Sequence, residues 1–205
     1  MSNRRAFIKA LISTAIATSF LPQVVSASET NNTNSNSPIK PKRLKAGDTI
    51  GLIAPGSNTW EDEEIYFAID VLKSFGFKVK KGKYLFERRA YLAGNDKDRA
   101  WDINNMFKDK EVDGIFCLRG GYGSPRILPY LDYDAIAANP KAFIGYSDVT
   151  ALLNAIYART GLVTFHGPIA RQNFSEYTLK SFKEILFSPK ANIDLGTPPL
   201  FEVRE

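Results

Sequence analysis

The sequence predicts an α/β fold with a mostly parallel open sheet flanked by helices, and two observations support this class. Short apolar runs alternate with amphipathic segments from about Arg43 onward, which is the pattern of successive βαβ units. Of the 205 residues, 44% are hydrophobic and 12% are aromatic, enough to build a buried core. We therefore expect one α/β domain over residues 43–190 and a tail over residues 191–205.

The domain is expected to begin with a strand, a helix and a second strand. Residues 49–54 are apolar and end in Pro55-Gly56-Ser57, which predicts a strand and a turn. A helix follows from an acidic start at residues 61–64, and Gly76 is placed to end it; its apolar residues recur at helical spacing, namely Ile65, Ile69, Leu72 and Phe75. Residues 77–79 are the expected second strand.

The middle of the chain predicts a further helix and the most clearly buried strand. Residues 96–108 place Ala100, Ile103 and Phe107 on one helical face, and the two acids and the arginine that open this helix are expected to cap it. Residues 114–118 form an uninterrupted apolar run, typical of a strand inside a parallel sheet. Short helical pieces are expected at residues 127–131 and 133–138.

Three elements complete the predicted domain. An apolar strand beginning at Ala142 runs into Ser147, and a helix over residues 148–160 follows with Leu152, Ala155 and Ile156 facing inward. Residues 162–165 predict another strand, and residues 176–187 predict the last helix. This alternation places Ser147 between a predicted strand and a predicted helix.

The N-terminal segment has the composition of an export signal. Arg4 and Arg5 precede an apolar stretch over residues 10–25, and small residues close it at Ala27, so residues 1–27 are predicted to be a twin-arginine-type signal cleaved after Ala27. An uncleaved membrane anchor is the alternative. Residues 28–42 are rich in Asn, Ser and Thr, which predicts a flexible linker. The expected compartment is the periplasm, with the cytoplasm as the alternative, and the export machinery is an expected partner.

Charge and metal-ligand counts argue against several classes of protein. The formal net charge of +5 includes Arg4, Arg5 and Lys9 of the predicted signal, and without them it is +2, so we expect no nucleic-acid partner. One cysteine cannot form an internal disulfide, and one histidine with one cysteine does not make a usual zinc site. We therefore expect neither a metal nor another cofactor.

Ser147 is the candidate nucleophile, because a strand that hands over abruptly to a helix leaves a serine hydroxyl at the edge of the sheet. The helix N-terminus after it presents backbone N–H groups that could hold an oxyanion. Val149 stands where a nucleophile elbow has its second glycine, so the pattern is incomplete. On spacing alone, a structural helix cap is the favoured interpretation, and the two roles do not exclude each other.

Residues 119–124, here called the glycine loop, are the second candidate for a binding site. Three glycines in four positions allow the backbone to approach a ligand closely, although the loop lacks the lysine of a nucleotide-binding loop. A tight turn without a ligand is the alternative. Tyr122 and Tyr146 are either substrate-binding pocket walls or core aromatics, and His166 is as easily a structural residue as a general base.

Five motifs in order carry a resemblance to a known family. They are Gly47-Asp48-Thr49-Ile50-Gly51-Leu52-Ile53-Ala54-Pro55-Gly56-Ser57, Tyr91-Leu92-Ala93-Gly94-Asn95-Asp96, Arg119-Gly120-Gly121-Tyr122-Gly123-Ser124, Gly145-Tyr146-Ser147-Asp148 and His166-Gly167-Pro168. From about residue 43 to residue 187 the chain resembles the LD-carboxypeptidases, serine peptidases that remove the terminal D-alanine of murein tetrapeptides. The resemblance implies an N-terminal α/β domain that carries the serine and a separate C-terminal domain.

The resemblance also implies the roles of individual residues. Ser147 would be the catalytic nucleophile, and the oxyanion hole would be the backbone N–H of Asp148 with one from Gly120 or Gly121. In the family a histidine and a glutamate of the C-terminal domain serve as base and orienting partner. The sequence stops at Glu205, so we expect that domain to be absent and the chain to be incomplete as an enzyme.

Several alternatives to a murein peptidase stay open at this stage. One is a protein that binds cell-wall peptide without cutting it. Another is a peptidase of the same family that acts on peptide-nucleotide antibiotics. Family members often form dimers, so a homodimer is a further expectation from the resemblance.

The export hypothesis can be tested by replacing Arg4 and Arg5 with lysine. Twin-arginine recognition requires the guanidinium groups, so the double variant should accumulate as uncleaved precursor in the cytoplasm. Fractionation of the host cell followed by N-terminal sequencing measures both the compartment and the cleavage site. A double variant that is exported and cleaved as efficiently as the original chain would contradict the hypothesis.

Overall fold

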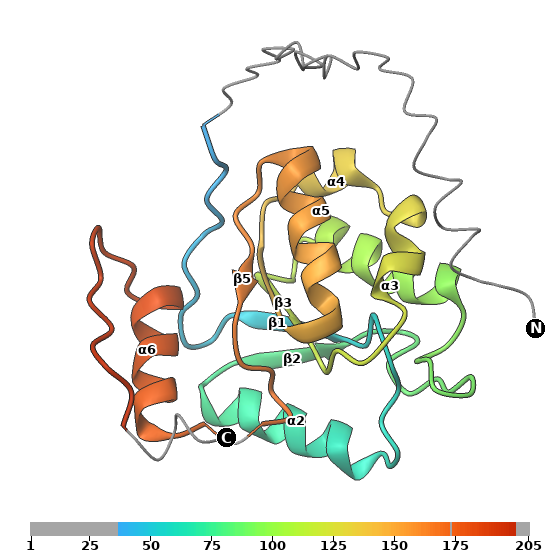
Figure 1. Cartoon of the computed structure of the whole chain (residues 1–205), viewed down its shortest axis with the longest axis horizontal. Helices are drawn as coiled ribbons and strands as arrows, with labels where there is room; N and C mark the ends of the chain where they lie inside the picture. Colours follow the sequence, from blue (N-terminus) through green and yellow to red (C-terminus); the bar gives the residue numbers. More distant parts are fainter. Residues whose placement is uncertain (1–36, 173, 200–205) are drawn as a thin grey trace, which may run out of the picture. The chain divides into compact units, whose positions relative to one another are not determined.

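The computed structural model describes residues 37–172 and 174–199, and Figure 1 shows how their elements are arranged. Five strands pair in parallel to form one sheet in the order β2-β1-β3-β4-β5, and helices lie on both of its faces. The strands are β1 (Thr49–Ile53), β2 (Lys78–Lys81), β3 (Gly114–Cys117), β4 (Ala142–Gly145) and β5 (Phe165–His166). The main helices are α2 (Glu63–Ser74), α3 (Asp96–Lys108), α4 (Tyr133–Ala138), α5 (Thr150–Thr160) and α6 (Glu176–Leu186). The predicted α/β class is confirmed.

The core consists of two apolar layers, one on each face of the sheet. Helices α2 and α6 pack on one face, where Leu72 and Phe182 meet Phe116 of β3. Helices α3, α4 and α5 pack on the other face, where Phe107 stacks on Phe143 of β4 with ring centroids 5.8 Å apart. Every residue of β3 and β4 is buried, as expected for central strands of a parallel sheet.

The strand order places a topological switch point between β1 and β3. The chain leaves β1 for β2 on one side and then adds β3, β4 and β5 on the other. Ligands of open α/β sheets bind at the carboxyl ends of the strands at such a point. The segments that follow β1 and β3 are residues 55–57, here called the proline turn, and the glycine loop.

Three elements differ from the sequence prediction. The last strand is only Phe165–His166, because residues 161–163 pair with Ile39 instead: the Ile39 N–H donates to Gly161 and the Val163 N–H donates to Ile39, at 2.8 and 2.9 Å. The helix after the serine begins as a 3₁₀ turn over Ser147–Val149, and the α-helix starts at Thr150. The helical piece expected at residues 127–131 is a 3₁₀ helix over Ser124–Tyr130, in which Pro129 lacks the N–H of a regular turn.

Parts of the predicted organisation fall outside the described residues. The predicted signal over residues 1–27, the linker as far as residue 36 and the tail beyond residue 199 are among them. Within residues 37–42, Ile39 pairs with the main domain, so this end of the predicted linker packs on it. None of the helices in the described ranges combines the length and the apolar character that crossing a membrane requires.

Asp102 of helix α3 holds the segment that follows strand β2 through hydrogen bonds to its backbone. Its side chain is 3% exposed, and its carboxylate accepts the N–H groups of Lys83 at 2.8 Å and Tyr84 at 3.1 Å. Burial raises the pKa of Asp102 to about 6, because removing water disfavours the charged form more than these two hydrogen bonds favour it. Because the folded-state pKa lies above the ordinary 3.8, the folded protein loses stability as the pH rises from 3.8 to about 6.

Replacing Asp102 by asparagine should remove this pH dependence. The amide oxygen of Asp102→Asn can accept both N–H groups but does not ionise, so the native protein should lose several degrees of melting temperature relative to the variant between about pH 4 and pH 6.5. Above that range the difference should be constant. Thermal melts of both proteins across the pH series measure the effect, and two parallel curves would contradict it.

Candidate active site

Ser147 follows the buried strand β4 and has an exposed side chain and an unusual backbone conformation. Its φ is 58°, in the left-handed region that non-glycine residues rarely adopt. Neither the 3₁₀ turn that it opens nor helix α5 has a side-chain cap hydrogen bond, so the structure does not support the capping interpretation. Left-handed serines cluster at functional sites, where surrounding contacts impose the strain.

Gly120 of the glycine loop packs directly against the backbone around Ser147. A Cβ atom added to Gly120 would lie 2.9 Å from Ser147 Cβ, 3.0 Å from the Tyr146 oxygen and 3.1 Å from the Asp148 nitrogen. Only glycine fits between these atoms. The structure therefore brings Ser147, Asp148 and Gly120 together, as the sequence predicted for a nucleophile and its oxyanion hole.

Hydrogen bonds fix the glycine loop relative to Ser147 and to the proline turn. The Asp148 carboxylate accepts the Ser124 N–H at 2.8 Å, which joins the end of the loop to the residue after the serine. The Ser57 N–H donates to Gly120 at 3.0 Å, and Ser57 Oγ accepts the Tyr122 N–H at 3.0 Å. Three segments from the adjacent strands β1, β3 and β4 thus form one connected edge.

Gly121 is the second close approach in the glycine loop. Its φ is 91°, and a Cβ atom there would lie 2.3 Å from Ser57 Oγ. No hydrogen bond from the Gly121 N–H to a loop or turn carbonyl is present within residues 37–172. Gly120 and Gly121 therefore pass between Ser147 on one side and Ser57 on the other.

Arg99 of helix α3 supports the edge that the proline turn, the glycine loop and Ser147 form. The sequence predicted only a capping role for this residue. Its side chain is 1% exposed, and its guanidinium donates to the carbonyls of Pro55 and Gly123, the second at 3.0 Å. It also pairs with Asp96. The signal was present, because Arg99 lies four residues before Ile103 and so faces the core with it.

Asp96 supplies the charge that balances two arginines. Burial alone would raise the pKa of Asp96, but hydrogen bonds from Arg126 and Arg99 outweigh it and hold that pKa below the ordinary 3.8. The carboxylate is therefore ionised at neutral pH. It joins helix α3 to Arg126, which follows the glycine loop, through an ion pair of 2.8 Å.

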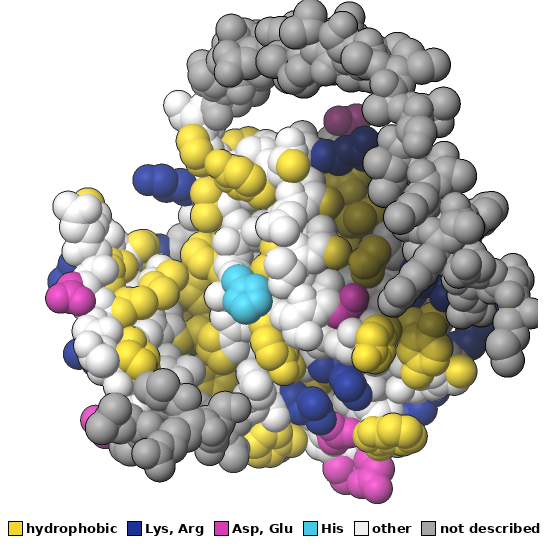
Figure 2. Space-filling view, viewed as in Figure 1, with side chains coloured by type: hydrophobic (Ala, Val, Ile, Leu, Met, Phe, Trp, Pro, Cys, Tyr) yellow, Lys and Arg dark blue, Asp and Glu magenta, His cyan; other side chains and the backbone are white. Residues whose placement is uncertain are grey.

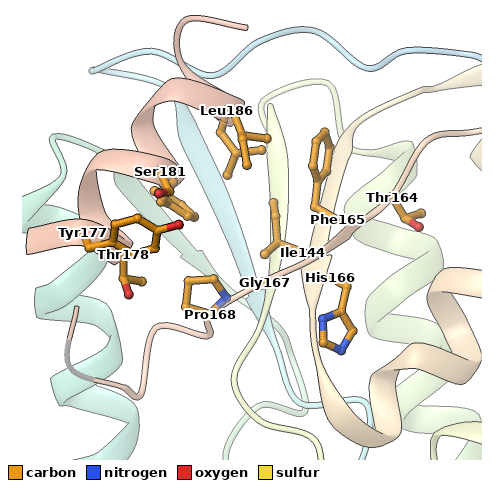
Figure 3. Close-up of a pocket in the computed structure, with 12 residues that line it drawn as sticks. Ile144, Thr164, Phe165, His166, Gly167, Pro168, Tyr177, Thr178, Ser181 and Leu186 are labelled. Atoms are coloured by element: carbon orange, nitrogen blue, oxygen red, sulfur yellow. The ribbon is translucent and has the colours of Figure 1, made fainter. Parts of the chain in front are cut away.

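His166 lies at the end of β5, on the surface of the molecule (cyan in Figure 2). Its ring stands edge-on to that of Tyr146, with centroids 6.4 Å apart, and it forms no hydrogen bond with Ser147 in the described structure. A pocket of about 320 Å³ lies beside it between β4, β5 and α6, and the side chain points away from Phe165 and Leu186 of that pocket (Figure 3). This geometry agrees with a structural residue rather than the base for Ser147.

The two candidate tyrosines lie in different environments. Tyr122 is 73% exposed and packs edge-on against Tyr91, with ring centroids 6.3 Å apart, at a pocket next to the proline turn. Tyr146 is half-buried and faces His166. The structure therefore does not bring them together as two walls of one pocket.

Metal ligands and the cysteine are the other groups that could bring chemistry to this edge. Within residues 37–172 and 174–199, no three His, Cys, Asp or Glu side chains are grouped so that they could hold a metal ion. Cys117 of β3 is buried, and burial raises the pKa of its thiol far above the ordinary value. The thiol stays protonated, and Ser147 is the exposed hydroxyl that the strand ends present.

The chain is similar to known proteins over most of its length. The family described as the LD-carboxypeptidase N-terminal domain matches residues 50–167. A probable murein peptide carboxypeptidase of Bacillus subtilis is 40% identical over 169 residues, covering 80% of this chain and 53% of the relative. The microcin C7 self-immunity protein MccF of Escherichia coli is 39% identical over 171 residues, covering 79% of this chain and 49% of the relative.

Solved structures agree. An MccF-like protein from Bacillus anthracis superposes with a TM-score of 0.69 at 38% identity, covering 73% of this chain and 47% of that one. A muramoyltetrapeptide carboxypeptidase from Oxalobacter formigenes superposes with a TM-score of 0.63 at 36% identity, covering 69% and 48%. The chain thus spans about half the length of these relatives. The chain belongs to the LD-carboxypeptidase family, and residues 50–167 match its N-terminal domain.

Proposed function

We propose that the chain is the nucleophile-bearing domain of a serine-type carboxypeptidase that releases the terminal D-alanine of murein tetrapeptides. The observation that carries the proposal is the exposed Ser147 at φ 58°, with Gly120 packed against its backbone. A strained serine at the carboxyl edge of a parallel sheet is the arrangement of a nucleophile elbow. Relatives named as murein peptide carboxypeptidases support the substrate class.

In the proposed reaction Ser147 Oγ attacks the carbonyl carbon of the amide that precedes D-alanine. The carbonyl oxygen becomes an oxyanion, which the Asp148 N–H and an N–H of Gly120 or Gly121 stabilise. The carbon–nitrogen bond then breaks, D-alanine leaves with the proton that the serine gave up, and water hydrolyses the acyl-enzyme. Support for these donors comes from the 3.1 Å approach of a Gly120 Cβ position to the Asp148 nitrogen.

The proton transfer needs a base, and we propose that it comes from outside the described residues. Within them, no hydrogen bond links His166 or a carboxylate to Ser147 Oγ. The family resemblance assigns the base and its partner to a histidine and a glutamate of a second domain. Without such a base a serine hydroxyl is a weak nucleophile, so the 205-residue chain by itself should be slow.

A peptide-nucleotide substrate is the second candidate. MccF, named as a microcin C7 self-immunity protein, matches this chain with a TM-score of 0.71 at 36% identity. The same Ser147 edge would serve either substrate, because both reactions attack an amide or a related carbonyl. A protein that binds cell-wall peptide without cleaving it is the third candidate, and the observation in its favour is that no described side chain forms a hydrogen bond with Ser147 Oγ as a base would.

Replacing Ser147 by alanine tests the nucleophile. We expect slow D-alanine release from a disaccharide-tetrapeptide by the 205-residue chain and release at the uncatalysed rate in Ser147→Ala. The residues of a triad act as a unit, so this further loss should be much smaller than the roughly 10⁶-fold that a complete enzyme loses with its serine. The affinity for the tetrapeptide should change little, because the hydroxyl is needed only for bond formation. Coupled detection of free D-alanine and a binding titration measure the two quantities.

The outcomes of this experiment separate the three candidates. Release that persists in Ser147→Ala at the original rate would remove Ser147 as the nucleophile. Tetrapeptide binding without release by the unchanged protein would favour the binding protein. Faster cleavage of a peptide-nucleotide than of the tetrapeptide would favour the second substrate.

Replacing Gly120 by alanine tests the proposed oxyanion hole. The added methyl group would have to displace Ser147 or the Asp148 nitrogen, so hydrolysis should fall by about 10²-fold. Gly167→Ala is the matched control, since a Cβ there meets nothing within 4 Å and Gly167 has no positive φ. Initial rates and melting temperatures of both variants give the comparison, and an unchanged rate in Gly120→Ala would contradict the assignment.

A further inference from the structure

A second pocket lies on the other side of the glycine loop from Ser147. It has a volume of about 490 Å³ and is bounded by residues 57–60, 88–91 and 119–122; its lining residues are Ser57, Asn58, Thr59, Trp60, Arg88, Ala90, Tyr91, Arg119 and Tyr122. Gly121 touches Ser57 of this pocket, while its neighbour Gly120 touches Ser147. Consecutive residues of the glycine loop thus lie next to Ser147 and next to Ser57 of the pocket.

Several acceptors at the pocket already take hydrogen bonds from the protein. The carbonyl of Asn58 accepts from Arg119 at 2.7 Å, that of Thr59 from Arg88 at 3.1 Å, and that of Ala90 from the Asn58 amide at 2.9 Å. Ser57 Oγ already accepts the Tyr122 N–H, which leaves its O–H to donate. A ligand that suits this wall is therefore rich in acceptors.

The charge of the pocket favours an anion. None of its lining residues is acidic, and two of them are arginines. Arg88 is paired with Asp62 and donates to Thr59, so much of its donor capacity is used. Arg119 has one protein hydrogen bond, to Asn58, which leaves the rest of its guanidinium for a planar anion such as a carboxylate.

The rim of the pocket consists of exposed aromatic side chains. Trp60 is 89% exposed, Tyr122 is 73% exposed and Tyr91 is 56% exposed. The Trp60 N–H donates to the Glu64 carboxylate at 3.0 Å, which holds this rim at the start of α2. Aromatic side chains beside two arginines match a small residue that ends in a carboxylate.

We propose that this pocket binds the terminal carboxylate of the peptide substrate and that Arg119 is its charged partner. The proposal rests on the proposed function, because it places the leaving residue on the Ser57 side of the glycine loop when Ser147 attacks the preceding carbonyl. Gly120 beside Ser147 and Gly121 beside Ser57 make the serine and the pocket neighbours across the loop. The pocket then makes the site select a chain end over an internal peptide bond.

Trp60 provides a direct reporter for the test. The chain contains two tryptophans, and Trp101 can be replaced by phenylalanine, which keeps a ring against Tyr84. In a Trp101→Phe, Ser147→Ala background, fluorescence titration with the tetrapeptide follows Trp60 alone without turnover. The tetrapeptide C-terminal amide is the matched probe, since it has the same shape but no terminal charge.

We expect the acid to bind and to change the Trp60 emission, and the amide to bind about tenfold or more weakly. In Arg119→Gln both probes should bind with the weak affinity of the amide, and Arg119→Lys should restore part of the difference. Arg89→Gln is the control, because Arg89 is adjacent to the pocket but does not line it, and it should preserve the difference between acid and amide. Melting temperatures show that each variant is folded.

The experiment distinguishes a wrong carboxylate site from a wrong substrate. Equal binding of acid and amide by the background protein, with a normal melting temperature, would overturn the carboxylate site while leaving the peptide substrate in place. Because that comparison needs no arginine variant, it stands even where Arg119→Gln does not fold. No binding of either peptide would remove the murein tetrapeptide as the substrate, and the carboxylate site with it.

Discussion

The candidate site depends on one buried guanidinium, that of Arg99. Its hydrogen bonds to the carbonyls of Pro55 and Gly123 join the proline turn after β1 to the glycine loop after β3. These strands flank the switch point, where the chain segments would otherwise diverge. A planar group with several fixed donors suits this purpose, and Asp96 balances its charge. A buried cation without that partner would be strongly destabilising, so the ion pair and the position of the loops depend on each other.

The contacts of the glycine loop then account for the strained serine. A left-handed backbone at a non-glycine residue costs on the order of 1–3 kcal/mol and persists only where the surroundings impose it. Here Gly120 occupies the space beside Ser147, and the Asp148 carboxylate is bound by the Ser124 N–H. The strain is therefore offset by contacts within one domain and does not require a bound substrate.

The sequence predicted the elements whose periodicity is local and missed those that depend on partners far along the chain. Helix α3 and strand β3 were predicted with their bounds nearly unchanged, because their apolar patterns decide the structure. The shortened strand β5 could not be predicted, since it results from pairing between residue 39 and residues 161–163. The predicted roles of Ser147 and Gly120 came from motifs, but their close packing and the positive φ of Ser147 follow only from the packing of two loops. Trp60 lies in a loop without periodicity and had no sequence signal, whereas the glycine loop and Tyr122, which line the same pocket, were candidates from the sequence.

The oxyanion donors and the general base proposed for the site are different kinds of chemical group. The proposed oxyanion donors are backbone N–H groups, held by the glycine loop and by Asp148, and their positions depend on the fold of this domain alone. A general base is a side chain, and it can come from another part of a protein without disturbing those donors. Relatives named for murein peptides and for microcin immunity share this domain at 36–40% identity. In the proposed mechanism this shared domain therefore supplies the groups that bind the substrate carbonyl, and the base comes from another part of the protein.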